Sequence, residues 1–397
     1  MRKKILILDT GKEWGGGTNS LLELLKRADR NRYEFSALFY NNYRMGASSD
    51  IKTELEKTGT RFIPFETAGR KLFIKPLKEI GRAALFFSRE LRKRFVFHAD
   101  YIGRVLPDSR RIAKVIKDGG FDMLYMNNQP SSNLEGILAA GYLGLPCVQH
   151  SRIEVSLNDV EAKAVNRHVS KVICVSKGVK DALVESGVEE GGCVVVYNGI
   201  DKDARPARDA LEVRSSLGIG ADAFLVGTAG SLIKRKRIGL LIDALAALRG
   251  AVRCLIVGDG PDMARLKEKA RMLGIGEMAV FAGFSSDALS LINAMDVFVL
   301  PSEKEGFPRV ILEAMLMAKP VVAFPVSGAR EMIVDGRTGL ILKKETPEAI
   351  TAALKELMVD RARLGRMGEA GRKRVISEFG MDRYVACVTA VFDEVLR

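Results

Sequence analysis

Glu305 and Glu313 lie eight positions apart in the stretch SEKEGFPRVILEAM, residues 302–315. The residues around Glu313 are almost all apolar, which predicts a buried helix. A carboxylate inside such a helix is unfavourable unless a partner donates hydrogen bonds to it. That partner is either another side chain, in a structural ion pair, or a ligand that carries hydroxyl groups.

The loop before this helix has the features of an anion site. The pattern predicts a strand that ends near Pro301 and a helix that begins near Pro308, because proline suits the first helical turn. Open α/β sheets bind ligands at the carboxyl ends of their strands. We expect the backbone amides of Phe307, Arg309 and Val310 to point at an anion there. A nucleotide sugar, with phosphates between two hydroxyl-bearing sugars, would satisfy both carboxylates.

A second stretch, GTAGSLIKRKR at residues 227–237, reads as a strand, a glycine turn and a basic loop. Gly230 lets the backbone approach a ligand closely. Arg235 and Lys236 supply positive charge for a diphosphate. Taken alone, a basic string of this kind is usually a solvated face.

Two further glycine turns follow predicted strands. In VGDGPD, residues 257–262, Gly258 and Gly260 predict a tight turn, but Met263 occupies the third glycine position of a dinucleotide fingerprint. In FAGF, Gly283 and Phe284 offer a floor for a base. Several strand-end loops of the second half therefore converge on one ligand.

Short β-rich runs alternate with helical patterns along most of the chain. The runs are KKILILDT, FSALFY, DMLYMN, PCVQH, KVICVS and CVVVYN in the first half, and FLVGTAG, VRCLIVGDG, VFAGF, VFVLPS, PVVAFP and TGLILK in the second. Most lack polar alternation, as expected of parallel strands covered by helices on both faces. The alternation occurs twice, which predicts two doubly wound α/β domains.

The charged, strand-free stretch at residues 198–218 marks the expected boundary between these domains. We expect a first domain over residues 1–200 and a second over 201–381. The last helix, residues 382–397, is free to pack back on the first domain.

Residues 69–114 interrupt the alternation with thirteen lysines and arginines against four acidic residues, interleaved with phenylalanines and a tyrosine. A basic helix with aromatic residues on its other face is typical of a segment that lies on an anionic membrane. A solvated helical insertion whose aromatics pack on the domain is the alternative. Nucleic acid is disfavoured because no nucleic-acid-binding module accompanies the charge.

Composition sets outer limits on the function. The net charge of +13 indicates a polyanionic partner or an anionic membrane surface. The five cysteines are scattered without metal-ligand spacing, as in a reducing compartment. No apolar run approaches the roughly 20 residues of a membrane span, and the run Ile5 to Leu8 is too short for a signal peptide. We expect a cytoplasmic protein, peripheral at the inner face of the cell membrane.

Taken together and in order, these motifs resemble the retaining GT-B glycosyltransferases of family 4, over nearly the whole chain. The strongest element is the E-x7-E motif of Glu305 and Glu313. GSLIKRKR, PVVAFPVSGAREMIVDGRTGLIL, ICVSKGVKDAL and VVVYNGID also look typical of the family. The resemblance implies two Rossmann-like domains that face each other across a cleft, with the acceptor in the first and the nucleotide sugar in the second.

The resemblance also implies roles for individual residues. Glu313 would bind the ribose hydroxyls, and Glu305 the hydroxyls of the donor sugar. Arg235 and Lys236 would neutralise the leaving diphosphate. His150, at a strand end, would lie near the sugar, although a lone histidine is more often a packed residue. The remaining donor contacts would come from Gly230, Ser231, Gly258, Gly260, Gly283, Phe284, Gly306, Phe307, Pro308 and Arg309, and the acceptor or phosphate loop from Gly15, Gly16, Gly17, Thr18 and Arg152.

The family mechanism retains the anomeric configuration, and we expect neither a cofactor nor a metal. The DKD string at residues 201–203 lies in the expected linker and is better explained as a charged turn. UDP is favoured as the donor nucleotide only because it is common in the family, and the acceptor is expected to be a lipid-linked or surface-polysaccharide precursor. The alternatives are a 2-epimerase on the same fold and a non-catalytic nucleotide-sugar binding protein.

Overall fold

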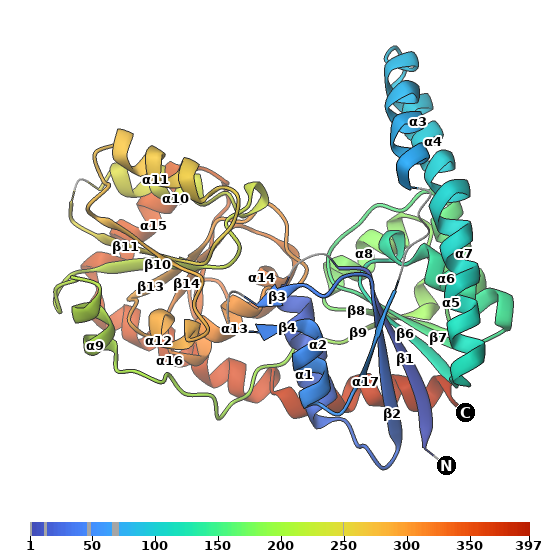
Figure 1. Cartoon of the computed structure of the whole chain (residues 1–397). Helices are drawn as coiled ribbons and strands as arrows, with labels where there is room; N and C mark the ends of the chain where they lie inside the picture. Colours follow the sequence, from blue (N-terminus) through green and yellow to red (C-terminus); the bar gives the residue numbers. More distant parts are fainter. Residues whose placement is uncertain (1, 12–13, 46–48, 66–70, 249) are drawn as a thin grey trace. The chain divides into compact units, whose positions relative to one another are not determined.

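The computed structural model describes residues 2–11, 14–45, 49–65, 71–248 and 250–397, except for the side chains of residues 45, 71–75 and 77. The chain divides into two compact units (Figure 1). Unit 1 comprises Met1–Cys174, Lys180–Val195 and Cys387–Arg397, and unit 2 comprises Val175–Val179 and Val196–Ala386. Each unit is described by itself below.

Unit 1 is built on a parallel sheet, seven-stranded within the described residues, with the order β5-β2-β1-β6-β7-β8-β9. Its strands are β1 (Lys3–Asp9), β2 (Tyr33–Phe39), β5 (Arg61–Pro64), β6 (Met123–Asn127), β7 (Cys147–Ser151), β8 (Lys171–Cys174) and β9 (Cys193–Val195). A short antiparallel pair, β3 (Arg44–Met45) and β4 (Ser49–Asp50), lies outside this sheet. The inner strand β1 is buried from Ile5 to Leu8, which explains its continuous apolar run.

The helices of unit 1 follow its strands in a doubly wound pattern. They are α1 (Gly16–Arg27), α2 (Ile51–Lys57), α3 (Lys71–Ala84), α4 (Arg89–Asp100), α5 (Leu106–Gly119), α6 (Leu134–Leu143) and α7 (Asp159–His168), with a π-helix (Tyr101–Val105) between α4 and α5 and 3₁₀ turns at Pro130–Ser132 and Glu190–Gly192. Figure 1 shows α3 and α4 as a hairpin that stands away from the sheet. The predicted insertion at residues 69–114 corresponds to this hairpin and α5, and its residues 69 and 70 lie outside the described residues.

Unit 2 has a second parallel sheet, six-stranded in the part of the chain described, with the order β12-β11-β10-β13-β14-β15. Its strands are β10 (Leu225–Ala229), β11 (Arg253–Val257), β12 (Ala279–Gly283), β13 (Val297–Leu300), β14 (Val321–Ala323) and β15 (Gly339–Ile341). The helices are α9 (Ala210–Ser216), α10 (Ile238–Ala246), α11 (Met263–Met272), α12 (Ala288–Asn293), α13 (Arg309–Leu316), α14 (Ser327–Met332), α15 (Pro347–Val359) and α16 (Arg361–Glu378), with a 3₁₀ turn at Lys234–Lys236.

Two helices contribute to both units. α8 (Lys177–Glu185) begins in unit 2 and continues in unit 1, and α17 (Met381–Val395) passes from unit 2 to unit 1 at residue 387. Within unit 1, Phe392 of α17 packs edge-on against Tyr33 and Tyr125, with ring centroids 6.0 and 5.1 Å apart. The Tyr33 hydroxyl also donates a hydrogen bond to the Asp393 carboxylate.

The sequence-based prediction of two doubly wound parallel sheets is confirmed, because each predicted strand has a counterpart in the observed sheets. The edge strand β5 and the short pair β3–β4 were not predicted. Residues 198–218 contain no strand, as expected, but they do contain α9. No helix of the described residues is both long and apolar enough to cross a bilayer.

Candidate functional site

Backbone hydrogen bonds hold the strand-end loops of unit 2 together. The Gly230 amide donates to the Val257 carbonyl at 2.9 Å, and the Gly258 amide donates to the Gly283 carbonyl at 2.7 Å. The loops after β10, β11 and β12 therefore meet at one edge of the sheet, as the sequence predicted from their glycines. The Glu303 amide adds the loop after β13, since it donates to the Arg235 carbonyl at 2.9 Å.

Gly258 and Gly260 are required by this convergence. Both have positive φ angles, 129° and 156°. A Cβ on Gly258 would overlap the Gly230 carbonyl oxygen, and a Cβ on Gly260 would lie 2.5 Å from the Leu232 carbonyl oxygen. Only glycine satisfies the backbone conformation and the close approach at the same time.

The basic pair of the 3₁₀ turn contacts Glu305 directly. The Lys236 ammonium donates to Glu305 Oε1 at 2.6 Å. Arg235 Nη1 donates to the Lys304 carbonyl at 2.6 Å and reaches Glu305 Oε2 at 3.4 Å. Glu305 is buried, so its negative charge partly neutralises two cations and fixes their direction. The cluster keeps a net positive charge, which suits an anionic ligand.

Glu313 lies in the fifth position of α13 and is half-buried. In the described part of the chain, its carboxylate makes neither a hydrogen bond nor an ion pair. Burial raises the pKa of Glu313, and the charge of Arg309 one turn earlier opposes this shift. The structural ion pair that would have explained a buried Glu313 is therefore not found among the described residues.

Of the remaining predicted donor residues, Gly306, Phe307, Pro308 and Arg309 lie at the start of α13, whereas Ser231 and Phe284 follow β10 and β12. α13 begins at Arg309, with Pro308 as its N-cap rather than in the first turn. The Phe307 side chain is buried and stacks on Tyr197, with centroids 5.1 Å apart, so only its backbone can face a ligand. Gly306 packs closely under α14, because a Cβ on Gly328 would lie 2.6 Å from the Gly306 carbonyl oxygen. Ser231 is half-buried, and Phe284 is 47% exposed.

Unit 1 carries a polar cluster at the carboxyl ends of three neighbouring strands. Asn127, the last residue of β6, donates through Nδ2 to Asp9 Oδ2 at 2.8 Å. Its Oδ1 accepts from Arg152 Nη2 at 2.6 Å. The Gly11 amide donates to Asp9 Oδ1 at 2.7 Å. Asp9 is buried, and this burial raises its pKa to about 6 against the opposing effects of Asn127, Gly11 and Arg152.

His150 lies near the carboxyl end of β7, as the sequence predicted, but its side chain does not reach the surface. Its side chain is fully buried in β7, and Nδ1 lies 2.6 Å from the Tyr125 hydroxyl. Burial, followed by the charge of Arg152, lowers the pKa of His150 well below 6.5, so the ring is neutral at physiological pH.

The glycine-rich segment GGGTNS is not a loop, as the sequence suggested, but the start of α1. Gly15 is the N-cap, and Gly16, Gly17 and Thr18 form the first turn. Thr18 is buried, and its hydroxyl lies 3.2 Å from the Tyr43 hydroxyl. The Arg152 side chain passes close to Gly17, since a Cβ there would lie 3.5 Å from Arg152 Cγ. Arg152 and this glycine turn therefore share one site in unit 1.

Asp9 and Asn127 are not among the site residues that the sequence predicted. The signal was present, because each is the polar residue that ends a buried apolar strand, ILILD and MLYMN. Parallel strands end at the same edge of a sheet, so such residues meet. No group of three histidine, cysteine or acidic side chains suited to a metal occurs among the described residues, and metal independence stays a prediction.

Two protein-family models match the chain. One, described as Glycosyltransferase Family 4, matches residues 14–204, and the other, Glycosyl transferases group 1, matches residues 209–374. Each of these ranges contains most of one of the two parallel sheets.

Curated relatives match over shorter stretches. A lipopolysaccharide core biosynthesis mannosyltransferase, LpsB of Rhizobium meliloti, is 30% identical over 214 residues, covering 51% of this chain and 61% of the relative. A GDP-mannose-dependent phosphatidylinositol monomannoside mannosyltransferase of Mycolicibacterium smegmatis is 37% identical over 188 residues, covering 44% and 49%. The chain spans only about half to three-fifths of the length of the first curated relatives that it matches.

Among solved structures, Anabaena HepE in complex with UDP aligns with a TM-score of 0.79 at 24% identity, covering 98% of this chain and all of that one. At this identity the likeness supports the fold, which is the GT-B fold. The two family models together span nearly the whole chain, and the chain belongs to the group 1 glycosyltransferases of family 4.

Proposed function

We propose that this protein is a glycosyltransferase that binds a nucleotide sugar in unit 2 and transfers the sugar to an acceptor bound at the strand ends of unit 1. The convergence of four strand-end loops, which bring Lys236 and Arg235 onto Glu305, carries this proposal together with Glu313 on the helix α13 that follows. Family membership supports it, since both family models describe glycosyltransferases.

Each charged residue then has a role. The cations would stabilise the charge that develops on the leaving diphosphate, which removes the need for a metal. Glu305 would accept hydrogen bonds from sugar hydroxyls, and Glu313 would accept them from the ribose. The favoured mechanism retains the anomeric configuration: the acceptor oxygen attacks the anomeric carbon on the face that the diphosphate leaves, and a departing phosphate oxygen takes the acceptor proton.

The donor is proposed to be a UDP-sugar. UDP is bound in the HepE structure, whereas the mannosyltransferase of Mycolicibacterium smegmatis is named as GDP-mannose-dependent, so both nucleotides must be tested. The acceptor is proposed to be a lipid-linked or polysaccharide precursor at an anionic membrane. The lipopolysaccharide role in the name of LpsB and the basic insertion of this chain support that class.

A thermal-shift panel in EDTA tests the donor site. UDP, GDP, ADP, dTDP and their common sugars are compared with wild type and Glu313→Ala. A ligand at about 100 times its dissociation constant adds roughly 2.7 kcal/mol of stability, so the matching nucleotide should raise the melting temperature of wild type and have a weaker effect on the variant. If the protein is folded and no nucleotide raises its melting temperature, the proposal is contradicted. Stabilisation without sugar transfer or donor hydrolysis would favour a binding protein instead.

The basic pair has a matched control in the same loop. Changing Arg235 and Lys236 together to alanine should lower turnover of the identified donor by orders of magnitude, since each preorganised charge contributes on the order of 3 kcal/mol. Arg237→Ala is the control, because Arg237 pairs with Glu303 and Glu345 rather than with Glu305. Similar turnover in the two variants would mean that the diphosphate binds elsewhere.

A further inference from the structure

The α3–α4 hairpin is a built element with its own packing. Gly81 of α3 faces Phe95 of α4 so closely that a Cβ on Gly81 would overlap the ring. Lys78 of α3 forms an ion pair with Asp100 at the end of α4. The two helices are therefore held together by the Gly81–Phe95 contact and by the Lys78–Asp100 ion pair, and they form one packed hairpin.

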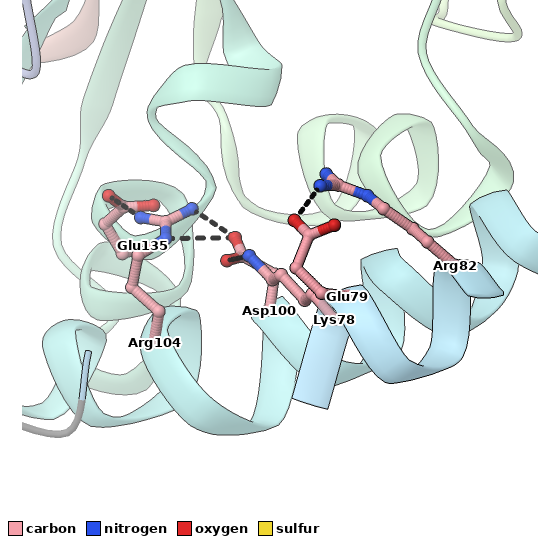
Figure 2. Close-up of polar contacts among 6 residues, drawn as sticks. All are labelled: Lys78, Glu79, Arg82, Asp100, Arg104 and Glu135. Atoms are coloured by element: carbon pink, nitrogen blue, oxygen red, sulfur yellow. Dashed lines mark hydrogen bonds and ion pairs between the residues drawn. The ribbon is translucent and has the colours of Figure 1, made fainter. Parts of the chain in front are cut away.

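A polar network fixes the base of this hairpin (Figure 2). Arg104, in the π-helix, donates through Nε to Asp100 at 3.0 Å and through Nη1 to Glu135 Oε1 at 2.7 Å. The Tyr40 hydroxyl donates to the same Glu135 oxygen at 2.9 Å. Glu135 is fully buried on α6, so removing Arg104 would leave a buried charge with a single neutral donor among these side chains.

This network lies at the carboxyl ends of the strands of unit 1, where the polar cluster of Asp9, Asn127 and Arg152 also lies. Tyr40 directly follows β2, and its amide donates to the Asp9 carbonyl at 3.4 Å. Asn133, two residues before Glu135, accepts from the Thr10 hydroxyl and donates to Gln149. The hairpin thus rises from the strand ends that hold Asp9 and Asn127.

The far end of the hairpin is apolar at its tip and cationic just below. Phe86 and Phe87 are 79% and 68% exposed, and their rings pack edge-on against each other with centroids 6.0 Å apart. The first turns of α4 then present four cations, three of them exposed: Arg89, Arg92, Lys93 and Arg94. Within the described residues, none of these four forms an ion pair, in contrast to Arg82, which pairs with Glu79.

We propose that the α3–α4 hairpin is a stalk whose tip inserts Phe86 and Phe87 into an anionic bilayer, with the four cations at the level of the lipid head groups. Aromatic side chains partition into the boundary of the bilayer, and cations close to an anionic surface strengthen the binding. Two exposed phenylalanines followed directly by four cations without ion pairs among the described residues match the apolar boundary and the anionic head groups of such a bilayer.

The stalk has a fixed length, which limits the acceptor. α4 has 12 residues, so at 1.5 Å per residue the tip stands about 18 Å from Asp100 and the base network. This step rests on the proposed function. The acceptor would then be a lipid-linked glycan with several sugars between the lipid and the reacting hydroxyl, rather than a lipid that carries one sugar.

Two tryptophan variants test the insertion. Phe87→Trp places a reporter at the tip, and Ile102→Trp places one at the base, where Ile102 is 64% exposed. The full-length variants are mixed with anionic vesicles whose acyl chains carry bromine, and the emission of Trp14, the only natural tryptophan, is subtracted with wild type. We expect the tryptophan at position 87 to lose most of its fluorescence and the one at position 102 to keep it.

Other outcomes would overturn the stalk. Equal quenching at both positions means that the hairpin lies flat, and quenching at neither means that the tip does not insert. If light scattering without vesicles shows that the protein dimerises as its concentration rises, and Phe86 and Phe87 become buried in that dimer, the tip binds a second copy of the chain instead of a bilayer. Arg92, Lys93 and Arg94 changed together to glutamate should abolish sedimentation with anionic vesicles, and unchanged sedimentation would refute the charge contribution.

The nucleotide thermal shift separates this inference from the proposed function. A protein that binds nucleotide normally but does not insert refutes the stalk alone. Insertion without any nucleotide response refutes the donor site and leaves the stalk standing.

Discussion

Glu305 and Glu313 share a motif but occupy different electrostatic environments. Glu305 is held by Lys236 and Arg235, whereas Glu313 is half-buried on α13 without an ion pair in the described part of the chain. A half-buried carboxylate without a partner is unfavourable, unless it accepts hydrogen bonds from a ligand. The two residues should therefore respond differently to truncation.

Glu313→Ala should weaken the binding of free nucleotide, because the ribose hydroxyls lose their acceptor. Glu305→Ala should leave nucleotide binding largely intact and impair sugar transfer, because Glu305 is proposed to accept hydrogen bonds from the donor sugar rather than from the nucleotide. Hydrogen bonds to charged groups contribute about 1.5 to 3 kcal/mol, so the Glu313→Ala dissociation constant should rise at least about tenfold. Calorimetric titration of both variants with nucleotide measures this, and equal affinity for wild type and Glu313→Ala would remove the ribose assignment.

Asp9 predicts a pH dependence of stability. Its pKa is raised from 3.8 to about 6 in the folded protein, so the folded state binds the proton more tightly than the unfolded state. The stabilisation from protonated Asp9 is fully present below pH 3.8 and is lost as the pH rises through about 6. The shift corresponds to about 3 kcal/mol.

Asp9→Asn removes this titration. The free energy of unfolding of wild type, measured relative to Asp9→Asn by chemical denaturation, should therefore fall between about pH 4 and about pH 6.5 and then level off. The Asn127 amide can still donate to the carboxamide oxygen that the substitution places at position 9, so the variant should fold. Parallel curves for the two proteins over this range would show that Asp9 does not titrate in this way.

At the scale of elements, the strands and their connecting glycines could be predicted from the sequence, whereas the contacts at their ends could not. Uninterrupted apolar runs such as the one in β1 specify a buried parallel strand. The pairing of Lys236 with Glu305 joins residues 69 positions apart, and no local pattern encodes it. The burial of His150 and Phe307 likewise depends on partners from distant segments, Tyr125 and Tyr197.

The same glycine turns give a prediction at this scale. Gly258→Ala should destabilise unit 2 by more than about 2 kcal/mol, on the order expected for left-handed strain plus a clash, and should abolish nucleotide binding. Gly274→Ala is the matched control, because Gly274 also has a positive φ angle, 72°, but faces open space. Denaturation with and without nucleotide measures both effects. If the two variants behaved alike, the convergence of the loops on Gly230 would not depend on the close approach.

At the scale of the whole molecule, the chain forms two parallel sheets, and the helices α8 and α17 each contribute residues to both units. The length and composition predict two domains and a basic surface, and the alternation of strands and helices predicts which part of the sequence forms each domain. The sequence allows the final helix to pack back on the first domain but does not require it, because its pattern fits any apolar surface. Its last segment, from Cys387, belongs to unit 1, where Phe392 fills a space between Tyr33 and Tyr125 that only the folded sheet creates.

Phe392→Ala should therefore destabilise unit 1 while the donor site in unit 2 keeps its function. Phe392 is fully buried, and truncation of a buried phenylalanine costs about 3 to 5 kcal/mol. Hydrogen exchange should show faster exchange in β1, β2 and β6, with β10 to β13 unchanged, and the nucleotide dissociation constant should stay near that of wild type. Leu211→Ala, at a side chain that is 59% exposed, should alter neither unit. A comparable loss of protection in both sheets would mean that the two units unfold as one cooperative structure, in which α17 couples their stabilities rather than completing the core of the first.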